Sequence, residues 1–187
     1  MKNRNLDNHD NWETPKELYD ELDAEFNFNF DPCPICFDEI TPEKDGLLIA
    51  WGERNFVNPP YSKKLKDAFV QRAVDVANDG NLCVCLLPVS TSTILFHDVI
   101  QPNATEIRFL RGRVKFIGVN TFGERVTNKP GMHDSMIVIF DGRGTSGRFR
   151  GGLSFGEDIS HSFKLIACGQ LLLSRALLEI SLLRMLL

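Results

Sequence analysis

The 187-residue sequence lacks the features that would assign it at once to several common classes. It has no excess of positive charge, because 25 acidic residues outnumber 21 lysines and arginines, so a nucleic-acid partner would need a local basic patch. It also lacks an uninterrupted apolar run that could cross a bilayer, since Arg175, Glu179 and Arg184 interrupt the leucine-rich C-terminal segment. The first 15 residues contain no apolar segment typical of a signal peptide, and we therefore expect a cytoplasmic protein.

The cysteines do not form a disulfide framework. Their number, five, is odd, which favours free thiols in a reducing compartment. Cys33 and Cys36 form a C-x-x-C pair, whereas Cys83 and Cys85 lie inside an apolar run with poor spacing for metal ligands. We expect buried, inert thiols and no metal. A small zinc module built on Cys33 and Cys36 is the alternative.

Apolar periodicity predicts alternating helices and strands. Leu18, Leu22 and Phe26 recur at helical spacing, which predicts a helix over residues 14–26. Further helices are predicted over residues 64–79 and 90–101, and strands over residues 28–31, 55–58, 82–88, 105–111, 113–118 and 135–140. Two of these strands are apolar throughout, as is typical of strands buried on both faces of a parallel sheet.

This alternation predicts an α/β fold with a mainly parallel sheet and helices on both faces. The domain would span residues 12–141, after a flexible N-terminus of residues 1–11. A Gly- and Arg-rich connector is expected over residues 142–152, followed by a leucine-rich helical extension over residues 153–187.

The loops that follow the strands of such a sheet meet at one edge, where ligands bind. We therefore expect Asp31, Asn58, Pro88 and the loop after Gly118 to converge on one cleft.

The stretch Asn58-Pro59-Pro60-Tyr61, at the end of a predicted strand, offers hydrogen-bond acceptors and few donors. Asn58 has a side-chain carbonyl, Pro59 has a backbone carbonyl, and neither proline has a backbone N–H. Two acceptors could bind the hydrogens of a planar amino group, such as N6 of adenine, and release its lone pair for attack. Tyr61 would provide a ring on which a flat base stacks. The alternative is a rigid corner in which Tyr61 only closes the core.

This motif resembles motif IV of the S-adenosylmethionine-dependent amino-methyltransferases. The order of the surrounding segments resembles the phage-type DNA N6-adenine methyltransferases, the Dam-like family, over residues 12–141. The segments that carry the resemblance are WETPKELYDELDAEFNFNFDPCP, DGLLIAWGERNFVNPPYS, VCLLPVSTST, TEIRFLRGRVKF and SMIVIF.

The resemblance implies a reduced Rossmann-like class I methyltransferase sheet and methyl transfer from S-adenosylmethionine to adenine N6 in double-stranded DNA. The target base would be swung out of the duplex and held by the four residues of the motif. It also implies a phage or prophage protein that acts in the cytoplasm of a bacterial host. The residues implied at the cofactor are Thr14, Pro15, Asp31, Pro32, Cys33 and, for the ribose, Asp45.

Basic residues are the candidates for contacts with DNA phosphates. The resemblance makes the segment with Arg108, Arg111, Arg113 and Lys115 a phosphate-binding candidate. Lys63 and Lys64 follow the motif at the start of a predicted helix, where a solvated face is the alternative to DNA contact. Base readout is assigned to the loop over residues 119–134.

The sequence departs from the family pattern in two ways. No Gly-x-Gly follows the strand that ends at Asp31, and only 27 positions separate Asp31 from Asn58, too few for the usual second and third strand–helix units. Three alternatives therefore stay open: methylation of an RNA base, methylation of a protein glutamine, and an inactive relative that only binds cofactor or nucleic acid.

Overall fold

The computed structural model describes residues 12–34, 41–119, 125–127, 130–144 and 162–165. Within them, five strands form one sheet in the order β1-β2-β6-β3-β7, and two short strands, β4 and β5, form a separate hairpin. The strands are β1 (Arg54–Val57), β2 (Leu82–Pro88), β3 (Glu106–Leu110), β4 (Gly118–Val119), β5 (Arg125–Val126), β6 (Ser135–Asp141) and β7 (Ser162–Leu165). The helices are α1 (Lys16–Phe26), α2 (Lys63–Asn78), the π-helical η2 (Leu95–Ile100) and α3 (Gln101–Asn103).

The fold is α/β as predicted, but the prediction of a mainly parallel sheet was wrong. Among the described strands only β1 and β2 pair in parallel, while β6 runs antiparallel to both β2 and β3, and β7 runs antiparallel to β3. The error has a physical cause. β6 is buried along almost its whole length because both faces of the sheet are covered, and that burial gives the same apolar sequence in either strand direction.

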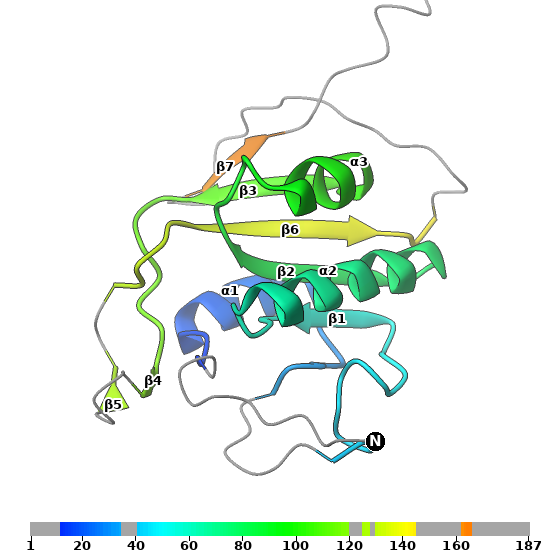
Figure 1. Ribbon diagram of the computed structural model, residues 1–187, viewed down its shortest axis with the longest axis horizontal. Coiled ribbons are helices and arrows are strands. Elements are labelled where there is room, and N and C mark those ends of the chain that lie inside the picture. Colours follow the sequence, from blue (N-terminus) through cyan, green and yellow to red (C-terminus); the bar gives the residue numbers. More distant parts are fainter. Residues whose placement is uncertain (1–11, 35–40, 120–124, 128–129, 145–161, 166–187) are drawn as a thin grey trace, which may run out of the picture.

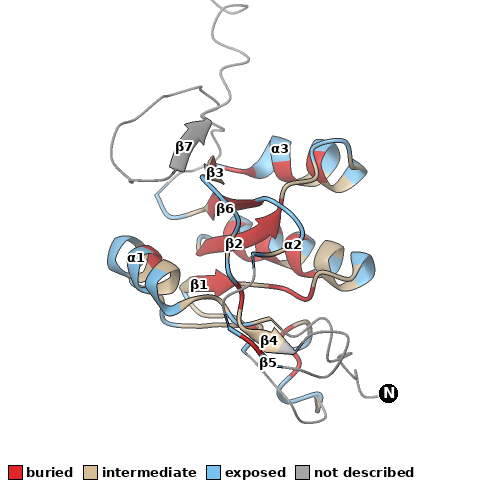
Figure 2. Cartoon of the chain, turned by 90° about the vertical axis from the view of Figure 1, so that its left-hand side faces the viewer, coloured by how far each residue is buried: buried red, intermediate tan, exposed pale blue. Residues whose placement is uncertain are grey.

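Helices cover both faces of the sheet (Figures 1 and 2). Alternate side chains of β2 point to opposite faces of the sheet. Those of Cys83, Cys85 and Leu87 belong to a core that contains side chains of α2 and η2. Leu82, Val84 and Leu86 join a second core on the opposite face, which contains Leu22 of α1. The interior strand β2 is therefore buried between two cores along its whole length.

Three predicted elements are reduced or displaced in the structure. The predicted strand over residues 28–31 pairs with β1 through one parallel bridge, between Phe30 and Asn55. In residues 113–118 the predicted strand is replaced by an antiparallel bridge between Ile117 and Glu13 and by the start of β4. The helix predicted from residue 90 begins at Leu95.

Both chain ends lie largely outside the described residues. The predicted flexible residues 1–11 are among those not described, as is most of the Gly- and Arg-rich connector. Within the predicted extension, the structure describes only Ser162–Leu165, which form the edge strand β7. None of the helices in the described ranges is long and apolar enough to cross a membrane.

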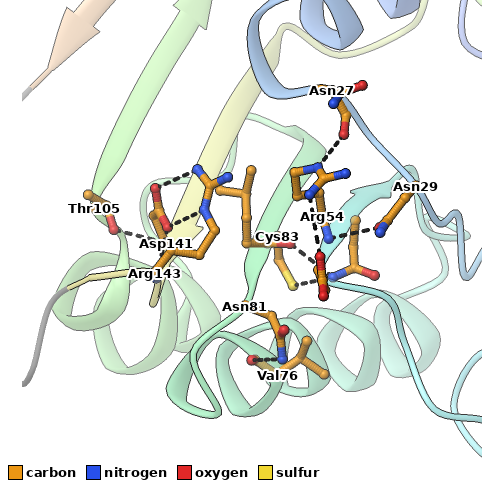
Figure 3. A network of polar contacts seen from close by, with 12 residues as sticks. Asn27, Asn29, Arg54, Val76, Asn81, Cys83, Thr105, Asp141 and Arg143 are labelled. Atoms are coloured by element: carbon orange, nitrogen blue, oxygen red, sulfur yellow. Dashed lines mark hydrogen bonds and ion pairs between the residues drawn. The ribbon is translucent and has the colours of Figure 1, made fainter.

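Polar side chains close the edge of the sheet where β1 and β2 begin (Figure 3). Arg54 donates from its backbone to the Asn29 side chain at 2.9 Å and from its guanidinium to the Asn27 carbonyl at 2.5 Å. On β6, the Asp141 carboxylate binds the Arg143 guanidinium at 2.9 and 3.0 Å. We call the opposite end of the sheet, where the strands β1 and β2 end, the open edge, and we expect ligands to bind there.

Arg108 joins α1 to the sheet through a buried ion pair. Its guanidinium is 2% exposed, binds the Glu25 carboxylate with two hydrogen bonds of 2.6 Å, and binds Glu106 at 2.8 Å. It also lies 5.3 Å from the centre of the Phe26 ring. A guanidinium held by two carboxylates is unavailable to a phosphate, so this position does not support the predicted role of Arg108 in DNA binding.

Removing one partner of this pair should destabilise the protein, because the remaining buried charge is left incompletely paired. We expect Glu25→Ala to lower the free energy of unfolding by about 2 kcal/mol in urea titrations. This loss is smaller than that expected for a fully buried pair, because the Glu25 side chain is 40% exposed. Asp20→Ala is the matched control on the same helix, because its pair with Lys16 is exposed and should change stability by less than about 0.5 kcal/mol. Equal losses in the two variants would contradict this assignment.

Candidate active site

The motif Asn58-Pro59-Pro60-Tyr61 connects the carboxyl end of β1 to the start of α2, at the open edge of the sheet. Both prolines are buried. They fix two φ angles and provide no N–H group, so the backbone here has carbonyl acceptors without competing donors. The motif thus lies at the position in the fold that the sequence predicts for it.

The side-chain amide of Asn58 is fixed by the segment that precedes α1. Its Nδ2 donates to the Trp12 carbonyl at 2.7 Å and to the Thr14 hydroxyl at 3.1 Å. Because a backbone carbonyl accepts but cannot donate, the atom that faces Trp12 must be the nitrogen. The other amide atom is then the oxygen Oδ1. Neither this oxygen nor the Pro59 carbonyl accepts a hydrogen bond from the part of the chain that the structure describes.

The segment with Trp12 and Thr14 is itself held in place. Glu13 and Ile117 exchange two backbone hydrogen bonds, of 2.7 and 3.0 Å. The Trp12 ring lies so close to Gly118 that a Cβ atom there would come within 2.5 Å of the indole. Sequence reasoning missed the pairing of this segment with residues 117–118, because the sequence offers no local signal for it.

Tyr61 packs against the core. Its ring contacts Phe116 edge-on, with centroids 5.9 Å apart, and its hydroxyl lies 3.5 Å from the Leu86 carbonyl. Burial raises the pKa of Tyr61 above its usual range, so the phenol is neutral. This packing agrees with the alternative in which Tyr61 closes the core, and its role as a stacking surface for a base stays a prediction.

Asp31 lies at the same edge, directly after the bridge between Phe30 and β1. Its Oδ1 accepts a 2.7 Å hydrogen bond from the backbone N–H of Cys33. Burial raises the pKa of Asp31 from 3.8 to about 6, and the hydrogen bond from Cys33 opposes this shift only in part. No cation among the described residues offsets this rise of the pKa.

Asp45 is brought next to this turn although 14 positions separate it from Asp31. A Cβ atom on the neighbouring Gly46 would lie 2.0 Å from the Pro32 carbonyl, so only glycine permits this approach. Trp51 holds the Gly46 carbonyl with a 2.6 Å hydrogen bond from its indole. Asp45 is buried, and its carboxylate accepts from the Leu47 N–H at 3.0 Å. A glycine thus allows close backbone approach here, but it comes from a different segment than the Gly-x-Gly of the family pattern.

The remaining basic candidates are exposed. Arg111, Arg113 and Lys115 lie in the segment between β3 and β4, where they line a cavity of about 410 Å³ beside α1. This cavity also has Glu17, Glu21 and Glu25 in its lining. It contains Pro15 of the residues predicted at the cofactor but no residue of the motif, so we do not assign it to the base. Lys63 and Lys64 are exposed at the start of α2, and Lys63 pairs with Asp67 at 2.5 Å, as expected of a solvated helix face.

The loop that precedes β6 reaches the same edge because β6 runs antiparallel to β2. Val89, just after β2, donates to the Asp134 carbonyl at 2.8 Å. Gly131 donates to the Val114 carbonyl at 2.9 Å, and the Asp134 carboxylate lies 3.3 Å from the Arg113 guanidinium. This loop and the basic segment therefore form one surface beside the motif.

The thiols do not form a metal centre among the described residues. Cys83 and Cys85 are buried on β2, and burial raises the pKa of Cys83 to about 12, which keeps this thiol protonated. Cys36, the second member of the predicted C-x-x-C pair, lies outside the described ranges. Within those ranges no three potential ligands gather at one point.

The pKa of Asp31 predicts a specific pH dependence of stability. Its ionised form is less favourable in the folded chain than in the unfolded chain, so above pH 6 the carboxylate lowers the free energy of unfolding. We expect Asp31→Asn, which keeps the acceptor for Cys33, to stabilise the protein by about 2 kcal/mol at pH 8. The gain should shrink as the pH falls from 6 to 4, because the folded chain then holds Asp31 neutral and the unfolded chain increasingly does so as the pH approaches 3.8. Urea titrations at pH 8 and pH 4 measure it, and a gain independent of pH would exclude burial of the charge as its cause.

Comparison with known proteins gives the chain its relatives. A protein of Escherichia phage T1 named DNA N-6-adenine-methyltransferase is 32% identical over 106 residues, which are 52% of this chain and 43% of the phage protein. The alignment thus spans less than half of that relative. No solved structure matches the chain. The model of the family DNA N-6-adenine-methyltransferase (Dam) matches residues 2–148, well over half of the sequence and including the whole motif. The chain therefore belongs to the DNA N-6-adenine-methyltransferase (Dam) family.

Proposed function

We propose that this protein transfers a methyl group from S-adenosylmethionine to N6 of an adenine in double-stranded DNA. One observation carries the proposal beyond family membership. The nitrogen of the Asn58 amide is bound by Trp12 and Thr14, so its oxygen is presented as an acceptor beside the carbonyl of Pro59. The substrate must offer two hydrogens on one planar nitrogen, as adenine N6 does.

The two acceptors act on the reacting nitrogen. Hydrogen bonds from both N–H groups to Asn58 and Pro59 favour a tetrahedral nitrogen, and its lone pair is then free to form the new N–C bond as the C–S bond breaks. The proton leaves after the nitrogen has become cationic, so the motif needs no strong base. Bound S-adenosylmethionine supplies the electrophilic methyl group. The part of this chain is positioning, which lowers the barrier by holding the acceptors ready.

The residues at the open edge fit such a cofactor. Asp31 is a partly buried carboxylate without a compensating cation among the described residues, and the ammonium of the methionine part would supply that charge. Pro32 and Cys33 form the turn next to it, and the close approach of Gly46 brings Asp45 to the same turn as the candidate for the ribose hydroxyls. Thr14 and Pro15 would line the pocket on the side of α1.

DNA would be bound by the exposed basic residues at this edge. Arg111, Arg113 and Lys115 are all solvent-accessible beside the loop over residues 130–134. Lys63 and Lys64 extend positive charge to the start of α2. Phosphate contacts of this kind fix the register of the duplex, while readout of bases is left to the loop. The substrate would be DNA inside a bacterial host cell.

Methyl transfer from labelled S-adenosylmethionine to duplex DNA tests the proposal. We expect the wild type to label adenine N6 and Asn58→Ala to be at least about 100-fold slower, because one of the two acceptors is lost. Asn103→Ala removes an exposed amide from α3, far from the motif in sequence and at the opposite edge of the sheet, and should leave the rate unchanged. If the wild type binds the cofactor but labels no DNA, the same assay with RNA and with glutamine-containing peptides decides among the alternatives.

The phosphate contacts predict a dependence on salt. We expect Arg111→Gln and Lys115→Gln each to weaken duplex binding and to reduce the slope of log affinity against log salt concentration by about 1. Arg143→Gln is the control, since this exposed arginine lies at the opposite edge and is paired with Asp141. Fluorescence anisotropy at several salt concentrations gives the slopes. An unchanged slope in both variants would place the DNA elsewhere.

A further inference from the structure

We propose that Thr14 and the backbone of Trp12 are positioning elements for Asn58, which orient its amide so that only the oxygen faces the target base. The inference rests on the proposed function and deepens it. The family resemblance places Thr14 at the cofactor, whereas its contact in the structure is with the residue that would hold the base.

An asparagine side chain without fixed neighbours could present either end of its amide. With the NH2 end outward it would donate, and two donors would then face each other when an amino group arrives. The Trp12 carbonyl at 2.7 Å and the Thr14 hydroxyl at 3.1 Å bind both hydrogens of the Asn58 amide. The outward atom is therefore the acceptor before any substrate binds, which avoids reorganisation during the reaction.

The two partners are themselves held in place. The paired backbone hydrogen bonds between Glu13 and Ile117 fix the segment from both sides. The indole of Trp12 rests on Gly118, where no side chain larger than hydrogen fits. Thr14 precedes Pro15, and a residue before proline is confined to extended conformations. The orientation of Asn58 thus depends on rigid backbone.

This arrangement explains why the motif begins with asparagine and not with aspartate. A carboxylate at this position would place an oxygen about 2.7 Å from the Trp12 carbonyl, and two acceptors at that distance repel. Only a protonated carboxyl could donate to Trp12 and present its other oxygen to the base. The asparagine amide needs no proton from solvent and works at neutral pH.

Three variants test the inference by single-turnover and steady-state methyl transfer to duplex DNA. We expect Thr14→Val, which keeps the shape but removes the acceptor, to lower kcat about tenfold. Its affinities for S-adenosylmethionine and for DNA should change less than about twofold, and Thr14→Ser, which restores the hydroxyl, should recover most of kcat. Unchanged cofactor binding also shows that each variant is folded.

The third variant, Asn58→Asp, should show a pH-dependent activity, which would not be expected if Trp12 and Thr14 only stabilised the fold. We expect it to be at least about 100-fold slower than wild type at pH 8, with the ratio improving about tenfold for each pH unit towards pH 6 as the new carboxyl becomes protonated. Asp31, whose pKa is raised, and Glu13 are the same in both proteins, so the ratio at each pH removes their contribution.

The outcomes distinguish a failure of the positioning role from a failure of the proposed function. An unchanged kcat in Thr14→Val, or a loss of cofactor affinity as large as the loss of kcat, would overturn the positioning role. An Asn58→Asp protein that is as active as wild type at pH 8 would do the same. A wild-type protein that labels no DNA at all would instead refute the proposed function.

Discussion

The parallel pairing of β1 with β2, extended by the bridge between Phe30 and Asn55, is the constraint on which the rest of the structure depends. Parallel neighbours end at the same edge, so this one pairing brings the turn after Phe30, the motif after β1 and the loop after β2 together. The opposite edge is closed by polar contacts of Arg54 and Asp141. Antiparallel β6 then brings a fourth connection, the loop that precedes it, to the open edge without disturbing the pair.

The open edge holds a charged group that reduces stability. Asp31 is partly buried, and no cation among the described residues offsets the rise of its pKa. Such features are typical of binding sites, where the free protein keeps a polar group poorly solvated and a ligand relieves it. The buried Arg108, with two carboxylates around it, shows the contrasting case of a charge that the fold itself neutralises.

Much of this arrangement could be predicted from the sequence, and the remainder depends on contacts between distant segments. The spacing of Leu18 and Leu22 predicted α1, and the apolar run before Asn58 placed the motif correctly at the end of a strand. The direction of β6 could not be predicted, because burial on both faces erases the pattern that distinguishes the two directions. Arg108 looked like a surface residue because its partner Glu25 lies 83 positions away. The contact between Trp12 and Gly118 depends in the same way on a pairing with no local signature.

The antiparallel entry of β6 has a consequence for how such enzymes diversify. The loop over residues 130–134 is tied at Gly131 to Val114 and at Asp134 to Val89, so its ends are set by the scaffold. Insertions and substitutions there need not disturb β1, β2 or the motif between β1 and α2. If this loop reads the bases of DNA, as we propose, relatives could change the sequence that they recognise while the motif stays the same.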